Sequence, residues 1–99
     1  MFTPAQFLIS CPLPHLAQEE ESQVTLAQEV AVDRMLLAGQ LLQYAVSEDE
    51  GRWWAILTAQ TEWHVRQLAA TLPWCIMDEL TVSELSFFAC NETQGFSLN

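Results

Sequence analysis

Three kinds of side chain in this sequence have the chemistry for a functional site: an arginine on an apolar helix face, a loop histidine and two neighbouring acids. Arg34 falls inside the apolar arc when Gln23 to Ala38 is placed on a helical wheel at about 100° per residue. The arc consists of Leu26, Ala27, Val30, Ala31, Leu37 and Ala38. A buried guanidinium without a partner is costly, so Arg34 needs a carboxylate. That carboxylate belongs either to a ligand or to the protein, for instance Asp78. An Arg34 that snorkels past the helix edge is the remaining alternative.

The adjacent acids Asp78 and Glu79 begin a predicted strand. Successive strand residues point to opposite faces, so these two carboxylates cannot work as a catalytic pair in one site. One of them is expected to reach the helix-covered face near Arg34, and the alternative is a solvated strand end that discourages edge pairing.

His15 follows the first strand and is placed to act as a general base at a pocket mouth. His64 lies at the margin of a helix stripe, where a half-buried structural role is commoner.

Large aromatic rings occupy two adjacent predicted strands. Trp53 and Trp54 are successive residues and face opposite sides, so one can line a pocket under the helices while the other packs in a dimer. The alternative is that both are core residues. We take Tyr44, Trp54 and Arg34 as candidate substrate-binding residues. Trp63 lies away from the apolar stripe of its helix, which indicates an oligomer contact.

The cysteines predict neither a metal site nor a disulfide framework. Cys11, Cys75 and Cys90 are an odd number without Cys-x-x-Cys spacing, so reduced thiols are the simplest interpretation. No His, Cys and carboxylate show metal-ligand spacing, and we predict no metal and no cofactor.

The start "MFTPAQFLISCPLP" has no basic leader, and no apolar span reaches membrane length. We therefore expect a soluble, cytoplasmic protein.

Size and charge narrow the class of partner. The 99 residues predict a single domain over positions 1–99. Thirteen carboxylates, three arginines and no lysine give a formal net charge of -10, which argues against nucleic acid and anionic membranes as partners. Hydrophobic residues make up 51% of the chain and charged ones only 16%, which favours burial of part of the surface against a second copy.

The predicted elements alternate in a recognisable order. The first half holds a strand at Phe7 to Cys11 and a helix from Gln23 to Ala38, which Gly39 closes. Two strands follow, from Leu41 and from Arg52, joined by a turn at Gly51. The last elements are a helix that Thr61 caps and that stops at Pro73, and a strand from about Ile76 to Phe88. This is the ferredoxin-like βαββαβ order of the α+β class, with a four-stranded antiparallel sheet and both helices on one face. The other face needs cover, and a second subunit is the usual cover.

Three segments resemble a known family: "DRMLLAG", "GRWW" and "LPWCIMDELTVSEL". Together they resemble the muconolactone isomerase family of dimeric α+β barrels over roughly Phe7 to Phe88. Arg34 and Gly39 match the family's arginine and glycine near the end of its first helix, and Leu72-Pro73 matches its Leu-Pro pair. In this sequence Ala45-Val46 stands where the family commonly carries Trp-Arg, and Ala55 stands roughly where it often has asparagine.

The resemblance implies a small enzyme that moves a proton along an unsaturated lactone carboxylate within a ring-like oligomer. Arg34 would anchor the anion, and His15 or an acid such as Asp78 would be the base. The alternative is a non-catalytic oligomeric module of the same fold that binds a small ligand or serves in assembly, which would explain Ala45-Val46. The expected partners are a second copy of the chain, in a homodimer or larger ring, and a small apolar carboxylate.

Overall fold

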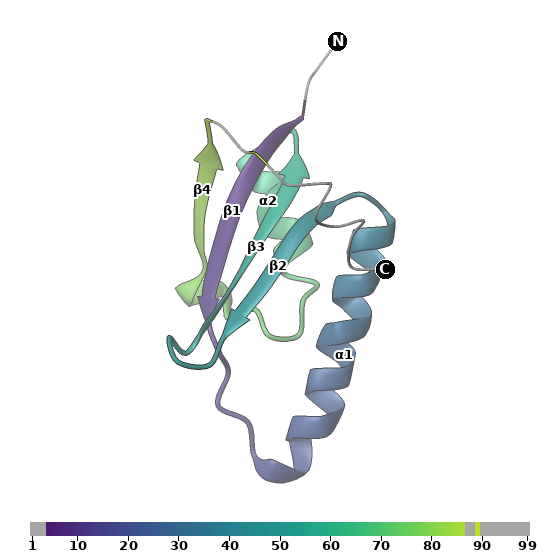
Figure 1. Cartoon of the computed structure of the whole chain (residues 1–99), viewed down its shortest axis with the longest axis vertical. Helices are drawn as coiled ribbons and strands as arrows, with labels where there is room; N and C mark the ends of the chain where they lie inside the picture. Colours follow the sequence, from purple (N-terminus) through teal and green to yellow (C-terminus); the bar gives the residue numbers. More distant parts are fainter. Residues whose placement is uncertain (1–3, 87–88, 90–99) are drawn as a thin grey trace.

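The computed structural model describes residues 4–86 and 89, which form four strands, two α-helices and one 3-10 turn (Figure 1). In chain order these are β1 (Ala5–Pro12), α1 (Gln18–Leu37), β2 (Leu41–Ser47), β3 (Arg52–Ala59), α2 (Glu62–Ala69), the turn η1 (Met77–Glu79) and β4 (Thr81–Leu85). The sheet order is β2-β3-β1-β4, and every neighbouring pair is antiparallel. The predicted α+β class and antiparallel sheet are confirmed, and the strand order is compatible with a ferredoxin-like fold.

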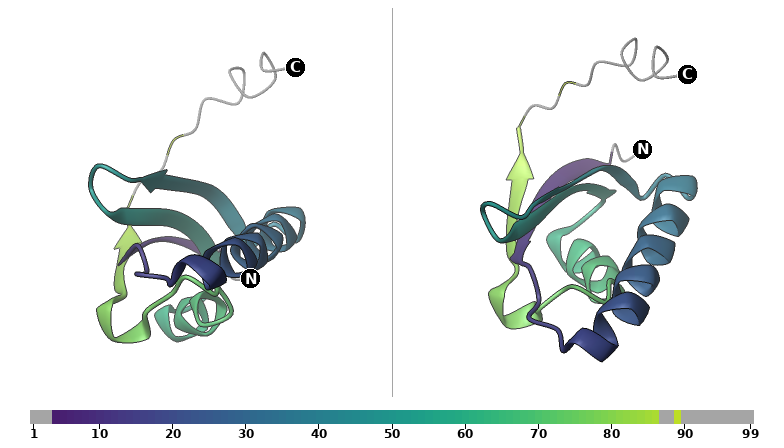
Figure 2. Two further views of the ribbon diagram at one scale, coloured as in Figure 1. Left: turned by 90° about the horizontal axis from the view of Figure 1, so that it is seen from below. Right: turned by 60° about the horizontal axis from the view of Figure 1, so that its bottom comes forward.

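Both helices cover the same face of the sheet, as Figure 2 shows. The cause is the alternation along β3, where Trp53, Ala55, Leu57 and Ala59 are buried and the residues between them are half-buried. Trp53 is fully buried beneath the helices, whereas Trp54 lies on the opposite, outer face. The predicted opposition of the two tryptophans is therefore confirmed.

Helix α1 begins earlier than predicted and buries a different face. The acidic run at its start forms the first helical turn, where carboxylates are favoured by the positive end of the helix dipole. Its buried residues are Gln28, Val32 and Met35. The predicted apolar arc is wrong, because Leu26 and Leu37 on that arc are 61% and 91% exposed. Apolar residues occur on two faces of α1, and tertiary contacts of Gln28 decide which face is buried.

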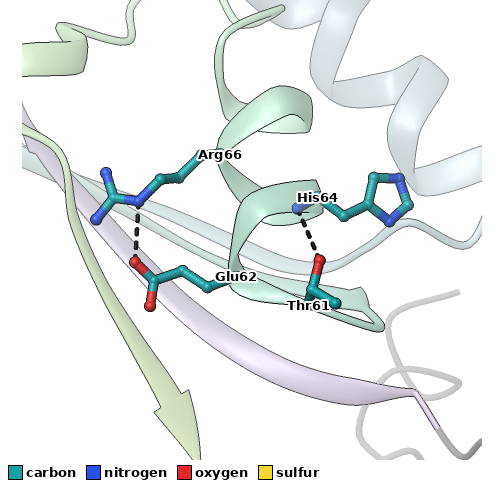
Figure 3. A network of polar contacts seen from close by, with 4 residues as sticks. All are labelled: Thr61, Glu62, His64 and Arg66. Atoms are coloured by element: carbon teal, nitrogen blue, oxygen red, sulfur yellow. Dashed lines mark hydrogen bonds and ion pairs between the residues drawn. The ribbon is translucent and has the colours of Figure 1, made fainter.

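The connections follow local rules. Gly39, after α1, and Gly51, in the β2–β3 hairpin, both have positive φ, at 74° and 65°. Thr61 caps α2, with its Oγ1 accepting a hydrogen bond from the His64 backbone N–H at 3.1 Å (Figure 3). One turn apart on α2, Arg66 and Glu62 form an exposed ion pair at 2.9 Å.

The last strand is shorter than predicted at its start. Met77, Asp78 and Glu79 form the 3-10 turn η1, and β4 begins at Thr81. The Ile76 backbone bonds to the Cys11 sulfur, and its carbonyl also accepts from the Glu79 N–H of η1 at 2.8 Å, so pairing of β4 with β1 starts at Thr81. The predicted end of this strand at Phe88 and the third cysteine, Cys90, lie outside the described residues.

Gly39→Ala should lower the free energy of unfolding by about 1 kcal/mol, because an added Cβ meets no atom within 4 Å and only the positive φ is penalised. Gly39→Asn should lower the free energy of unfolding by less than Gly39→Ala does, because asparagine tolerates a positive φ better than alanine. Urea unfolding followed by circular dichroism measures both values. An alanine variant as stable as the parent would contradict this account.

Candidate functional site

A cavity of about 700 Å³ lies at the β2 end of the sheet, next to α1. Its lining comes from both faces of the sheet and from α1, and consists of Leu8, Glu29, Val32, Asp33, Leu36, Leu42, Gln43, Tyr44, Ala45, Trp54, Ala55 and Ile56. Most of these side chains are apolar or aromatic. This volume and lining are typical of small-molecule sites.

The charges of this cavity are all negative. Glu29 and Asp33 lie one turn apart on α1, both are exposed, and no arginine or histidine is among the described lining residues. A carboxylate ligand would meet repulsion here, whereas an ammonium group would be attracted. The cavity therefore favours uncharged or cationic apolar molecules.

The amide of Gln28 fixes the wall of the cavity at Tyr44. Gln28 is only 1% exposed; its Nε2 donates to the Tyr44 hydroxyl at 3.0 Å, and its Oε1 accepts from the Trp74 backbone N–H at 3.0 Å. The ring of Tyr44 also packs against Trp53, with centroids 6.1 Å apart. Sequence reasoning missed Gln28, because its partners Tyr44 and Trp74 are 16 and 46 residues away in the chain and no local pattern marks it.

Burial raises the pKa of Tyr44 above its usual value of 10.0, while the hydrogen bond from Gln28 lowers it and the nearby Glu29 carboxylate raises it. Tyr44 is therefore a neutral phenol at pH 7. It presents one hydroxyl, already bonded to Gln28, to an otherwise apolar cavity. Such a group orients a ligand by hydrogen bonding and does not act as an anionic base.

Arg34, the predicted anchor for an anionic ligand, does not line the 700 Å³ cavity. Arg34 is exposed on α1, where it lines a separate depression of about 460 Å³ together with Thr71 and Pro73 from the segment after α2. The expectation that Arg34 is buried is wrong, because the opposite face of α1 packs on the sheet. Among the described residues, Arg34 forms no ion pair, so the predicted bridge to Asp78 is absent.

The two candidate catalytic residues line neither this depression nor the cavity. His15 is exposed in the loop between β1 and α1, and Asp78 is exposed in η1. The predicted position of Asp78 at the start of a strand is wrong. Tyr44 and Trp54 do line one cavity, and their contact with a ligand stays a prediction.

A second cavity of about 560 Å³ lies between the start of α1 and Trp74 and shares Glu29 with the first. Its charged lining residues are Glu21, Glu29 and Glu48, again all acidic. The indole N–H of Trp74 is buried without a hydrogen-bond partner in the described part of the chain. The acidic character of the α1–β2 side thus extends over both cavities.

Substitutions around Tyr44 should move its pKa in opposite directions. Gln28→Leu removes the hydrogen bond to the phenolate and should raise the pKa, whereas Glu29→Gln removes a negative charge and should lower it. The chain has one tyrosine, so absorbance during alkaline titration reports Tyr44 alone. Because the folded pKa exceeds the unfolded one, stability should also fall as pH rises above 10.0.

Glu50→Gln, in the β2–β3 turn, makes the same change of charge outside the cavity and should leave the Tyr44 titration unchanged. Equal titrations in the Gln28→Leu variant and the parent would contradict the hydrogen bond as a cause.

Two sequence comparisons leave the family of this chain open. No protein-family model matches the chain, and a search of curated proteins finds no match. Neither helix of the described segment has the combination of length and apolar character needed to cross a membrane. Function is therefore inferred from the fold and the cavities.

Proposed function

We propose that this chain is a non-catalytic, self-associating module that binds an uncharged or cationic apolar small molecule between α1 and the β2 end of the sheet. The observation that carries the proposal is the composition of the 700 Å³ cavity, where Tyr44 and Trp54 accompany aliphatic side chains and the described charges are Glu29 and Asp33. Aromatic and aliphatic walls supply affinity by desolvation, and the two carboxylates select against anions.

Binding is favoured over isomerisation of a lactone acid because the described lining has no cation to anchor the carboxylate of such a substrate. Abstraction of a proton next to a carbonyl needs a base within reach and a group that stabilises the developing enolate. The described lining offers two exposed carboxylates and a neutral phenol, and no cation. The isomerase function implied by the sequence resemblance, with Arg34, His15 and Asp78 as its residues, stays a prediction that this cavity does not favour.

The outer face of the sheet supports self-association. Leu8, Trp54 and Ile56 are half-buried on this face, opposite the helices. Apart from Arg52, the described strand residues that point to this face are uncharged, although the chain as a whole carries a net charge of -10. Arg52 has a neutral partner, because its Nε donates to Ser10 Oγ at 2.9 Å.

A second copy of the chain is the occupant that fits this face. Two strongly acidic proteins repel each other, and a neutral contact surface keeps the carboxylates of both copies at a distance where salt screens them. The same Leu8, Trp54 and Ile56 also belong to the cavity lining, so a second copy on this face would close the cavity on that side. Dimerisation and ligand binding are therefore parts of one proposal.

Three matched dyes test the charge preference of the cavity: diphenylhexatriene, its trimethylammonium derivative and its propionic acid derivative. Fluorescence titration should show binding of the neutral and cationic dyes, with the anionic dye at least roughly tenfold weaker. Asp33→Asn should lower the affinity for the cationic dye by roughly two- to fivefold, because one exposed carboxylate contributes up to about 1 kcal/mol to the binding free energy of a cation. The neutral dye should bind that variant unchanged.

Glu50→Gln is the control, because it changes the net charge equally outside the cavity. Preference for the propionic acid derivative would overturn the assignment of ligand class. Arg34-dependent uptake of deuterium into muconolactone in heavy water would contradict a non-catalytic role.

Sedimentation equilibrium tests the second copy. The parent chain should be a dimer, and Ile56→Asp should be a monomer because it places a carboxylate in the contact of both copies. Leu26→Asp makes the same kind of change on the exposed side of α1 and should remain a dimer. A monomeric parent, or dissociation caused only by Leu26→Asp, would overturn this arrangement.

A further inference from the structure

Three sulfur atoms meet where the end of β1 lies against the segment that follows α2. The Cys11 thiol donates to the Ile76 carbonyl at 3.3 Å and accepts from the Ile76 N–H at 3.2 Å, which holds it beside Cys75. Besides the effect of burial, the Cys11 side chain is near enough to that of Cys75 to raise the pKa of the Cys75 thiol. Cys75 Sγ in turn lies 3.5 Å from Met77 Sδ. Residues far apart in sequence therefore place two thiols and one thioether in contact.

The surroundings of Cys75 disfavour its reaction as a nucleophile or redox group. Burial, followed by the neighbouring Cys11, raises the pKa of Cys75 to about 12. Thiol–disulfide exchange and alkylation proceed through the thiolate, which is scarce at neutral pH for such a thiol. A strongly thiophilic metal ion is different, because formation of metal–sulfur bonds itself displaces the protons.

The ligand set also distinguishes between metals. Zinc prefers four nitrogen, oxygen or sulfur ligands, and no group of three or more His, Cys, Asp or Glu residues in the described segment is placed to hold a metal. Thiolates and thioethers are soft ligands that suit Cu(I), zinc and iron–sulfur clusters, and a set of three sulfurs falls short of the four ligands that the latter two usually take. Metal–sulfur bonds of about 2.3 Å place the sulfurs of a trigonal site about 4 Å apart, close to the 3.5 Å between Cys75 Sγ and Met77 Sδ.

We propose that Cys11, Cys75 and Met77 form a binding site for Cu(I), with two thiolate ligands and one thioether ligand. Binding breaks the two S–H bonds, releases both protons to solvent and forms three copper–sulfur bonds, with no change in the oxidation state of copper or sulfur. Cys11 is fully buried, whereas Met77 is 41% exposed. The ion would therefore enter past Met77, and Cys11 would form the inner wall.

The cluster was missed by sequence reasoning for two reasons. Metal-ligand spacings of His, Cys and carboxylates do not include the thioether of Met77. The only local signal is the Cys-x-Met spacing of Cys75 and Met77. Cys11 lies 65 residues from Ile76 in the sequence and comes near them only because β1 contacts Ile76 in the folded chain.

Competition for Cu(I) tests the site. All variants carry Cys90→Ser, so that the third thiol does not contribute. Anaerobic titration with bathocuproine disulfonate should show one Cu(I) bound per chain, with ultraviolet copper–thiolate absorption. Cys75→Ser should weaken binding by roughly 100-fold and Met77→Leu by at least roughly tenfold, because loss of a direct ligand costs no less than loss of its supporting contacts.

Met35→Leu is the matched control, since it makes the same change in the core and should leave copper affinity unchanged. Circular dichroism verifies that each variant is folded. Equal affinity in the parent and in Cys75→Ser would overturn the site. Binding that depends on Cys75 but not on Met77 would overturn the three-sulfur geometry.

Discussion

The buried amide of Gln28 is the contact on which the arrangement of this protein depends. One side-chain amide joins α1, the edge strand β2 and the segment after α2, through Tyr44 and the backbone of Trp74. A buried amide is costly unless its hydrogen bonds are made, and these two bonds are made only in the orientation in which α1 turns this residue inward. Once it does, Val32 and Met35 are buried with it, and Arg34 is left on the outside.

Charge is distributed unevenly over the two sides of the molecule. Carboxylates gather at the start of α1, along its cavity edge and in the β2–β3 turn, while the outer face of the sheet has only Arg52 among its described charges. For a chain with thirteen acids and three arginines, this separation decides which contacts are feasible. Cations and uncharged molecules can approach the α1 side, and other acidic proteins can approach the sheet.

Features set by local rules were predictable from the sequence, and those set by distant contacts were not. The alternation of Trp53 and Trp54, the Thr61 cap and the glycines at positions 39 and 51 each follow from a few neighbouring residues. The buried face of α1 depends on Trp74, 46 residues from Gln28, and the start of β4 depends on Cys11, 65 residues from Ile76. Tyr44 and Trp54 were found because aromatic strand residues stand out, whereas Glu29 and Asp33 look like ordinary helix-surface acids.

The packing of the single tyrosine against a fully buried tryptophan has an optical consequence. With ring centroids 6.1 Å apart, excitation energy absorbed by Tyr44 passes to Trp53 before the tyrosine can emit. The folded chain therefore emits as a tryptophan protein, and tyrosine emission rises when unfolding moves Tyr44 away from the tryptophans. The packing of β2 on the core thus contributes to an intrinsic fluorescent reporter of unfolding.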